Sequence, residues 1–409
     1  MEKLGKYCKI ISGYAFKSND LSEGTEIPVI KIGNISNGDD IITDSSTQYV
    51  SSDFLSIDEK YHIKKGDVLI SLTGSHINQP NSMVGRSCRN FSDTEFLLNQ
   101  RAGKVIPNEN ADKNYLYYLL NTESFKYSIC NRAYGAANQA NVSPSDIENI
   151  KWNFPPLPTQ KKIASILSAY DDLIQNYKKQ IQALQTAASE LYKEWFVRFR
   201  FPGYQNTKFE NGIPEGWKYL KLSEFGYEAE SGNRPFGGID GSLEDGIPSL
   251  GAESIDKLGY FDYSNVKLVP REFYDKMKRG LYKDGAYIGK VTLFRNGFPF
   301  NEYAVNEHVF LLRSNNKNYQ NHLYFTLNMP QYFTQMQNLN RNAAQPGLVR
   351  GDLDRIKILA PDEKIIEKFN KFINPIIDNV FSYSKQITNL TQQRDLLLPR
   401  LMSGKLEIK

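Results

Sequence analysis

Two polar segments hold the side chains of this sequence that are best suited to recognition chemistry. The first runs from Asn131 to Asn141 and combines Arg, Tyr, Asn and Gln with little apolar periodicity. The second runs from Asn340 to Arg350 and occupies the comparable place in the second half of the chain. Such side chains form hydrogen bonds with base edges and phosphates. Both segments are therefore candidate nucleic-acid surfaces, although the same composition also suits a solvated turn.

A third candidate is the glycine-rich run Ser231-Gly-Asn-Arg-Pro-Phe-Gly-Gly238. It lacks the strand-to-helix context of a dinucleotide-binding loop, so a turn near a binding surface is the better interpretation. The candidate nucleic-acid-binding residues of the three segments are Arg132, Tyr134, Asn138, Gln139, Asn141, Arg234, Arg341, Asn342, Gln345 and Arg350.

Patterns that would carry out catalysis are missing from the sequence. It has no GxxxxGK[ST] phosphate loop, so no ATP-driven motor is predicted. Asn153-Phe-Pro-Pro-Leu157 has the letters of an amino-methyltransferase NPP[FY] motif in the wrong order. The histidines show no metal-ligand spacing with cysteines, and Asp171 and Asp172 are expected to be solvated on a helix. We expect a protein that binds rather than catalyses, with no catalytic residue, metal or cofactor.

Composition limits the partners and the location of the protein. Fifty Lys and Arg oppose 46 Asp and Glu, a net charge of +4, so a basic binding surface would have to be local. Cys8, Cys88 and Cys130 are odd in number and lack CxxC spacing, which suits reduced thiols. No apolar run approaches a membrane span, and the N-terminus lacks a signal-peptide core. We expect a soluble, cytoplasmic protein with no membrane partner.

A long helix with a heptad repeat must position the polar segments. Apolar residues recur in steps of four and three from Ile163 to Trp195, between Pro158 and Pro202. This 3.5-residue period favours a coiled-coil arm over a buried core helix, with a seam of roughly 50 Å. The predicted seam residues of this helix are Ile163, Leu167, Tyr170, Ile174, Tyr177, Ile181, Leu184 and Leu191.

A second helix repeats this seam 206 residues later in the chain. Its only charged seam position is Arg394, and Pro375 should kink its early turns. The helices are predicted to pair with each other. The apolar seam residues of the second helix are Phe369, Ile373, Ile376, Val380, Tyr383, Ile387, Leu390 and Leu397.

The repeat extends into the rest of the chain. Asn114–Asn121 matches Asn321–Asn328 at an offset of 207, and Asn99-Gln100 matches Asn306-Glu307 at the same offset. Short β-like runs precede a predicted helix over 114–129. We predict an α+β fold with two globular domains separated by two long helices that form an antiparallel coiled coil, in a pseudo-two-fold internal repeat. The predicted segments are 1–150, 151–203, 204–356 and 357–409.

These features resemble the specificity subunit of type I restriction-modification enzymes. The similarity is strongest at Pro155–Leu167, at the KQI..L cores Lys179–Leu184 and Lys385–Leu390, and at the ending Leu397–Leu406. The second helix departs from the pattern where Pro361-Asp-Glu-Lys-Ile365 replaces the Pro-Thr-Gln-Lys-Lys-Ile of the first.

The resemblance implies a non-catalytic subunit that binds double-stranded DNA. Residues 1–150 and 204–356 would be two target recognition domains, each reading one half of a bipartite, asymmetric site. Residues 151–203 and 357–409 would form a helical spacer on which two methylation subunits dock, and restriction subunits would join the full complex. A coiled-coil scaffold that joins two protein-binding domains fits the repeat and the seam equally well. Basic concavities around the polar segments would favour DNA, whereas apolar patches would favour protein partners.

Overall fold

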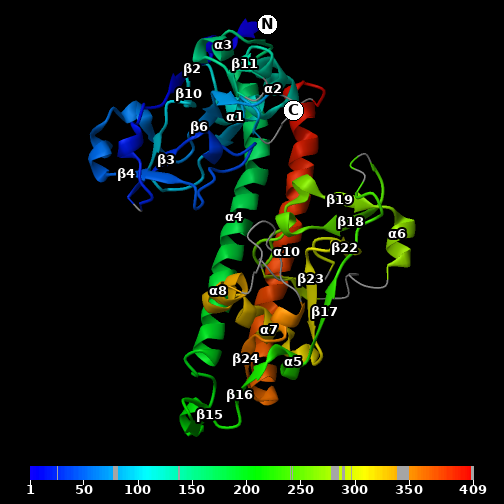
Figure 1. Cartoon of the computed structure of the whole chain (residues 1–409). Coiled ribbons are helices and arrows are strands. Elements are labelled where there is room, and N and C mark those ends of the chain that lie inside the picture. Colours follow the sequence, from blue (N-terminus) through cyan, green and yellow to red (C-terminus); the bar gives the residue numbers. More distant parts are fainter. Residues whose placement is uncertain are drawn as a thin grey trace. The chain divides into compact units, whose positions relative to one another are not determined.

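The structure is a computed structural model that describes the chain apart from residues 25, 77–81, 137–138, 240, 242, 278–284, 288–290, 296, 339–349 and 407–409. It divides into two compact units, which we call unit 1 (residues 1–175 and 390–409) and unit 2 (residues 176–389). Two long helices, α4 (Leu157–Phe196) and α10 (Glu363–Met402), each contribute a part to both units (Figure 1).

Unit 1 builds its globular part from short, mainly antiparallel strands. One sheet has the order β2-β10-β6-β8, and another has the order β4-β3-β9-β5 with β3 and β9 parallel. The strands of these sheets are β2 (Cys8–Ser12), β10 (Ala102–Pro107), β6 (Val68–Ser71), β8 (Ser87–Arg89), β4 (Gln48–Val50), β3 (Ile27–Ile30), β9 (Phe96–Leu98) and β5 (His62–Ile63). Smaller elements are β1 (Glu2–Lys3), β13 (Lys151–Trp152) and α3 (Pro144–Glu148).

Unit 2 repeats the main features of this plan, although its second sheet has three strands in the order β19-β18-β22. The order β17-β23-β20-β21 follows the same succession along the chain as β2-β10-β6-β8, and β18 again pairs in parallel with β22. The internal repeat predicted from the sequence is therefore confirmed. The strands are β17 (Tyr227–Ser231), β23 (Phe310–Ser314), β20 (Gly285–Tyr287), β21 (Thr292–Phe294), β19 (Lys267–Val269), β18 (Ile247–Leu250) and β22 (Ala304–Val305). Other elements are β14 (Phe209–Glu210), β15 (Ile213–Pro214), β16 (Lys218–Lys221), β24 (Lys357–Ala360), α5 (Leu222–Phe225), α6 (Arg271–Lys276) and α9 (Arg350–Leu353).

The prediction of a single helix over 114–129 is wrong, because the helix is interrupted at Thr122. Helix α1 (Lys113–Asn121) ends there and α2 (Glu123–Cys130) begins. The Thr122 hydroxyl donates to the Leu119 carbonyl at 2.8 Å and accepts from the Phe125 amide at 3.4 Å. A threonine hydroxyl that caps a helix in this way favours a helix boundary over a helix interior. Unit 2 has a comparable break between α7 (Gln320–Leu327) and α8 (Pro330–Asn338).

The long helices pack against each other in antiparallel fashion within each unit. In unit 1, Ile163 and Leu167 near the start of α4 share a buried cluster with Leu401 near the end of α10. In unit 2, the rings of Tyr177 and Tyr383 stack with centroids 5.0 Å apart. All the predicted seam residues are buried or half-buried. Helix α10 runs through Pro375 without a break.

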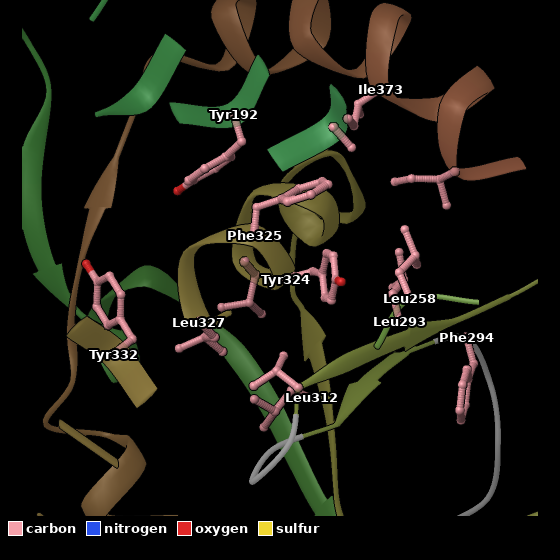
Figure 2. Close-up of a cluster of buried hydrophobic side chains, with 14 of the residues drawn as sticks. Tyr192, Leu258, Leu293, Phe294, Leu312, Tyr324, Phe325, Leu327, Tyr332 and Ile373 are labelled. Carbon is pink, nitrogen blue, oxygen red and sulfur yellow. The ribbon is translucent and has the colours of Figure 1, made fainter. Parts of the chain in front are cut away.

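The core of unit 2 is an aromatic cluster that joins α4 and α10 to the globular part (Figure 2). Tyr192 of α4 stacks on Phe325 of α7 with ring centroids 5.4 Å apart. Its hydroxyl forms a 2.6 Å hydrogen bond with the Thr326 hydroxyl. Phe369 of α10 meets the Tyr192 ring edge-on. Such rings contribute large apolar areas and favourable edge-to-face contacts, so the helices are part of the domain core.

A fully buried histidine lies in this core. His322 of α7 donates from Nε2 to the Leu359 carbonyl at 2.7 Å. Burial lowers the pKa of His322 from 6.5 to about 4, since an imidazolium would lose its hydration there. The folded protein therefore holds a neutral imidazole at neutral pH.

We predict that unit 2 loses stability as the pH falls from about 6.5 to about 4. Between these values the unfolded chain takes up a proton on His322 and the folded chain does not, so the free energy of unfolding falls by about 3 kcal/mol in total. Urea unfolding between pH 4 and 8 measures this. His322→Gln should flatten that part of the profile, and the matched substitution of the exposed His308→Gln should not. Identical profiles for wild type and His322→Gln would contradict the prediction.

Candidate nucleic-acid interface

The polar segment 131–141 of unit 1 forms a β-hairpin where the sequence suggested a loop. Strand β11 (Tyr134–Ala136) pairs with β12 (Gln139–Asn141), and β12 pairs in turn with β7 (Thr73–Gly74). Gly135 has a φ of +118°, and a Cβ at this position would lie 2.5 Å from the Gln139 carbonyl oxygen. Only glycine fits without strain at such a place. The hairpin therefore holds its side chains on a paired backbone.

The candidate residues of this segment lie in different environments. Arg132, Tyr134 and Gln139 are exposed, Tyr134 at 60%. Asn141 is half-buried and accepts a 2.9 Å hydrogen bond from the Thr73 hydroxyl, which joins β12 to β7. Asn138 lies outside the described residues. Three of the candidates thus have side chains at the surface, and Asn141 has a structural contact.

A groove beside the hairpin adds two arginines that sequence reasoning missed. It has a volume of about 370 Å³, and its lining includes Gln139, Arg86 and Arg101. Arg86 is half-buried and donates from Nη2 to the Ile32 carbonyl at 3.0 Å, and burial lowers its pKa. Arg101 is exposed. The sequence did contain one signal for Arg101, because this residue directly follows the repeated pair Asn99-Gln100.

The corresponding place in unit 2 has different side chains. Gln100 and Arg101 correspond to Glu307 and His308 at the offset of 207. The candidate Arg234 forms an ion pair with Glu307 and lies 3.4 Å from Nε2 of His308. The candidates Arg341, Asn342 and Gln345 lie outside the described residues, and Arg350 begins α9.

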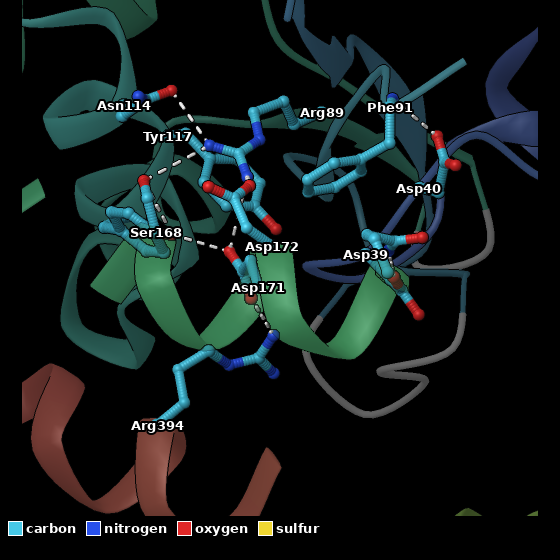
Figure 3. Close-up of polar contacts among 12 residues, drawn as sticks. Asp39, Asp40, Arg89, Phe91, Asn114, Tyr117, Ser168, Asp171, Asp172 and Arg394 are labelled. Carbon is cyan, nitrogen blue, oxygen red and sulfur yellow. Dashed lines mark hydrogen bonds and ion pairs between the residues drawn. The ribbon is translucent and has the colours of Figure 1, made fainter. Parts of the chain in front are cut away.

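A buried polar cluster attaches the globular part of unit 1 to α4 (Figure 3). Arg89, at the end of β8, has a side chain only 6% exposed and donates from Nη1 to Asn114 Oδ1 at 2.9 Å. The same nitrogen lies 3.4 Å from the Ser168 hydroxyl on α4, and Nη2 lies 3.7 Å from Asp172 Oδ1. The guanidinium also lies over the Phe91 ring, 4.2 Å from its centroid. One arginine thus joins a strand, α1 and the long helix.

The same cluster recurs in unit 2. Arg295 donates from Nη1 to Asn374 Oδ1 at 3.2 Å and pairs through Nη2 with Asp378 at 3.0 Å. Asn321 of α7 donates to the same Asn374 oxygen at 2.8 Å. These residues are the repeat positions of the unit 1 cluster, at offsets of 206 or 207. Each globular part is therefore held to its long helix by an equivalent arginine.

Asp171 corrects the expectation of a solvated pair of carboxylates. Its side chain is only 3% exposed, and Oδ1 accepts from Arg394 Nη1 at 2.7 Å. Oδ2 accepts from the Tyr118 hydroxyl at 2.6 Å (Figure 3). Burial, and then the Asp171 charge, raise the pKa of Tyr118, so this hydroxyl remains a donor. The charged seam residue Arg394 therefore has a buried partner on the other long helix, while Asp172 is exposed.

Comparison with known proteins identifies the family. The model of the type I restriction modification DNA specificity domain matches residues 1–186 and 214–391. The chain belongs to this family. Within the part of the chain that is described, no cluster of His, Cys, Asp and Glu suits a metal ion, and no helix is long and apolar enough to cross a membrane.

Relatives match this specificity subunit over most of its length. The type I restriction enzyme MjaIX specificity subunit of Methanocaldococcus jannaschii is 26% identical, over 98% of this chain and 91% of the relative. The HindI specificity subunit of Haemophilus influenzae is 22% identical, over 85% of this chain and 88% of the relative. In fold, the chain is similar to the S subunit of M. genitalium, with a TM-score of 0.56, 16% identity and coverage of 100% of this chain and 96% of that one.

The family gives this specificity subunit its role. It recognises DNA sequence for a type I restriction-modification complex and is the non-catalytic component of that enzyme. Its partners are DNA and the methylation and restriction subunits. The interpretation as a protein-binding scaffold is not favoured.

We predict that Arg89→Met destabilises unit 1 selectively. The substitution leaves Asn114 and Ser168 without the guanidinium that joins them, and removing one partner of a buried polar group costs about 3 kcal/mol. Hydrogen exchange in β8 and α1 should accelerate accordingly, while unit 2 amides keep their protection. The exposed Arg132→Met is the matched control, with a change of about 0.5 kcal/mol or less. Unaltered protection of α1 in Arg89→Met would refute the anchoring role.

Proposed function

We propose that the globular parts of the two units each read one half of a bipartite, asymmetric site in double-stranded DNA. The observation that carries this proposal is the repeated strand order with altered side chains at equivalent positions, as at Arg101 and His308. A shared scaffold places two readers in the same chain, and different side chains give them different preferences. The target recognition domains would be 1–150 and 204–356, and the spacer segments 151–203 and 357–409.

The groove beside the hairpin of unit 1 is the proposed reading surface of that unit. Arg86, Arg101 and Gln139 line it, and Arg132 and Tyr134 are exposed on the same segment as Gln139. Arginine bonds well to the O6 and N7 atoms of guanine, and glutamine bonds to the N6 and N7 atoms of adenine. An exposed arginine can also neutralise a phosphate. For unit 2, we propose Arg234 and the segment that contains Arg341, Asn342, Gln345 and Arg350.

Arg101→Ala tests this surface. We predict that affinity for the selected site falls by about 1–3 kcal/mol, with relaxed preference in one half-site only, because a single domain loses a base contact. Selection of duplexes from a random library, followed by titration at several salt concentrations, measures both effects.

Lys151→Ala is the control for the loss of one positive charge. Lys151 is exposed on β13, which pairs with β1 rather than with the hairpin. This variant should retain the wild-type selection in both half-sites. An Arg101→Ala protein that selects the wild-type sequence with unchanged affinity would rule out the groove, and altered preference in both halves would contradict the modular arrangement.

We propose further that two methylation subunits dock on the exposed faces of α4 and α10. Exposed apolar side chains support this: Leu396 is 66% exposed, Phe372 is 57% exposed, and Leu173 is 39% exposed. A partner that covered these side chains would remove apolar surface from water, which favours association. Assembly with such subunits on DNA would take place in the cytoplasm.

Leu396→Asp should weaken this assembly about tenfold or more without unfolding the chain, because it places a charge in the proposed interface. Ile42→Asp, at an exposed apolar side chain in the globular part of unit 1 and outside both long helices, is the matched control. Co-purification with a tagged methylation subunit, with circular dichroism of each variant, gives the measurement. Equal recovery of the subunit with both variants would exclude this part of α10 as the docking site.

A further inference from the structure

One cross-helix contact of unit 1 joins two charged residues whose repeat positions in unit 2 are both apolar. In unit 1, Asp171 of α4 contacts Arg394 of α10 at 2.7 Å. The offset of 206 converts Asp171 into Ile377 of α10, and Arg394 into Ala188 of α4. Ile377 and Ala188 are both fully buried in the core cluster of unit 2. The two positions that form an ion pair in unit 1 are thus both apolar and buried at their repeats in unit 2.

This difference distinguishes α4 from α10 as pairing partners. The other seam positions of both helices are apolar or aromatic, so they would also allow α4 to pair with α4 of a second copy. In that pairing, Asp171 would face Ala188 of the second copy. In a pairing of two α10 helices, Arg394 would face Ile377. Either arrangement removes the cross-helix partner of a buried charge.

We propose that the ion pair Asp171–Arg394 selects the pairing of α4 with α10 and disfavours pairing of either helix with a second copy of itself. A single buried polar contact in a coiled-coil seam can specify partner choice, because breaking it leaves a charge buried without its partner. The loss of the cross-helix partner costs more for Arg394 than for Asp171. Asp171 would keep the Tyr118 hydroxyl at 2.6 Å and Arg89 at 3.8 Å, whereas Arg394 would keep only its neighbour Asp395, among its ion-pair partners in the described structure.

The globular part of unit 1 helps to place this ion pair. Tyr118 belongs to α1 and Arg89 to β8, and both approach the same Asp171 oxygen. These contacts hold one oxygen of the carboxylate while the other accepts from Arg394. In unit 2 the repeat position needs no such support, since Ile377 is apolar. The selection of partner is therefore located in unit 1.

A nicked form of the full chain tests the proposal. A protease site inserted at Gly203, where a Cβ would have no neighbour within 4 Å, allows the folded protein to be cut between its halves. Tyr177→Cys serves as the reporter. Tyr177 stacks on Tyr383, which is its own repeat position, so a pair of two α4 helices would bring Cys at 177 opposite its copy. The natural cysteines are buried.

With Asp171 and Arg394 present, mild oxidation of the nicked protein should give almost no dimer linked through position 177. Asp171→Ile with Arg394→Ala copies the residues of unit 2 and should raise this dimer at least tenfold. Asp171→Asn with Arg394→Gln keeps similar side-chain sizes without charge and should act in the same direction, which guards against a folding defect in the first variant. Circular dichroism before cutting verifies the fold.

The control removes an exposed ion pair from α4. Glu190→Gln with Lys193→Gln eliminates a 2.7 Å surface contact and should leave the dimer yield unchanged. Abundant dimer in the nicked protein that retains Asp171 and Arg394 would overturn the proposal. So would a yield that stays at the control level in both neutral variants.

Discussion

Each globular part is attached to its long helix through an arginine, which is buried in unit 1 (Arg89) and half-buried in unit 2 (Arg295), and this contact governs how the elements of each unit pack. Arg89 and Arg295 end or follow short strands, yet each reaches a polar residue on α4 or α10 and is linked to an asparagine network. A buried guanidinium is costly unless its donors are paired in fixed geometry. The strands, the short helices and the long helix must therefore keep their mutual positions within each unit.

This rigid attachment allows the exposed side chains to vary. The sheets β2-β10-β6-β8 and β17-β23-β20-β21 share their strand order, but Gln100 and Arg101 correspond to Glu307 and His308. Apolar packing and backbone pairing do not involve the tips of these side chains, so their replacement leaves the fold intact. A protein that recognises different sequences with a repeated scaffold needs this separation between core and surface.

The helix pair shows the same division between shared packing and individual charge. Most seam positions are apolar in both helices, and Tyr177 faces its own repeat, Tyr383. Apolar packing is non-directional and cannot by itself distinguish similar partners. Asp171 and Arg394 supply direction, since a buried charge accepts only a complementary group. The pair gives two nearly equivalent helices separate identities.

The periodic features of this protein can be predicted from its sequence. The heptad seams, the 206-residue repeat and the α+β class depend on regular spacing of apolar residues along the chain. The KQI..L cores and the proline-rich segment before α4 pointed to the specificity-subunit family before any fold was known. Arg89 and Arg295 lie 206 residues apart, at the offset of the internal repeat, so the sequence also contained a signal for the two arginines that attach the globular parts to the long helices.

Which polar groups are buried, and what they contact, depends on how the helices and strands pack in three dimensions. Asp171 reads as a solvated helix residue until α1 and α10 cover it, and the groove arginines Arg86 and Arg101 lie far from Gln139 in sequence. The break between α1 and α2 has a local cause in the Thr122 hydroxyl. A threonine hydroxyl can either cap a helix or face solvent, so the residue type alone does not predict the break. Hydrogen bonds and ion pairs depend on distance and direction in space, whereas the period of apolar residues can be read along the chain. The helix seams could therefore be predicted from the sequence, and the buried polar contacts could not.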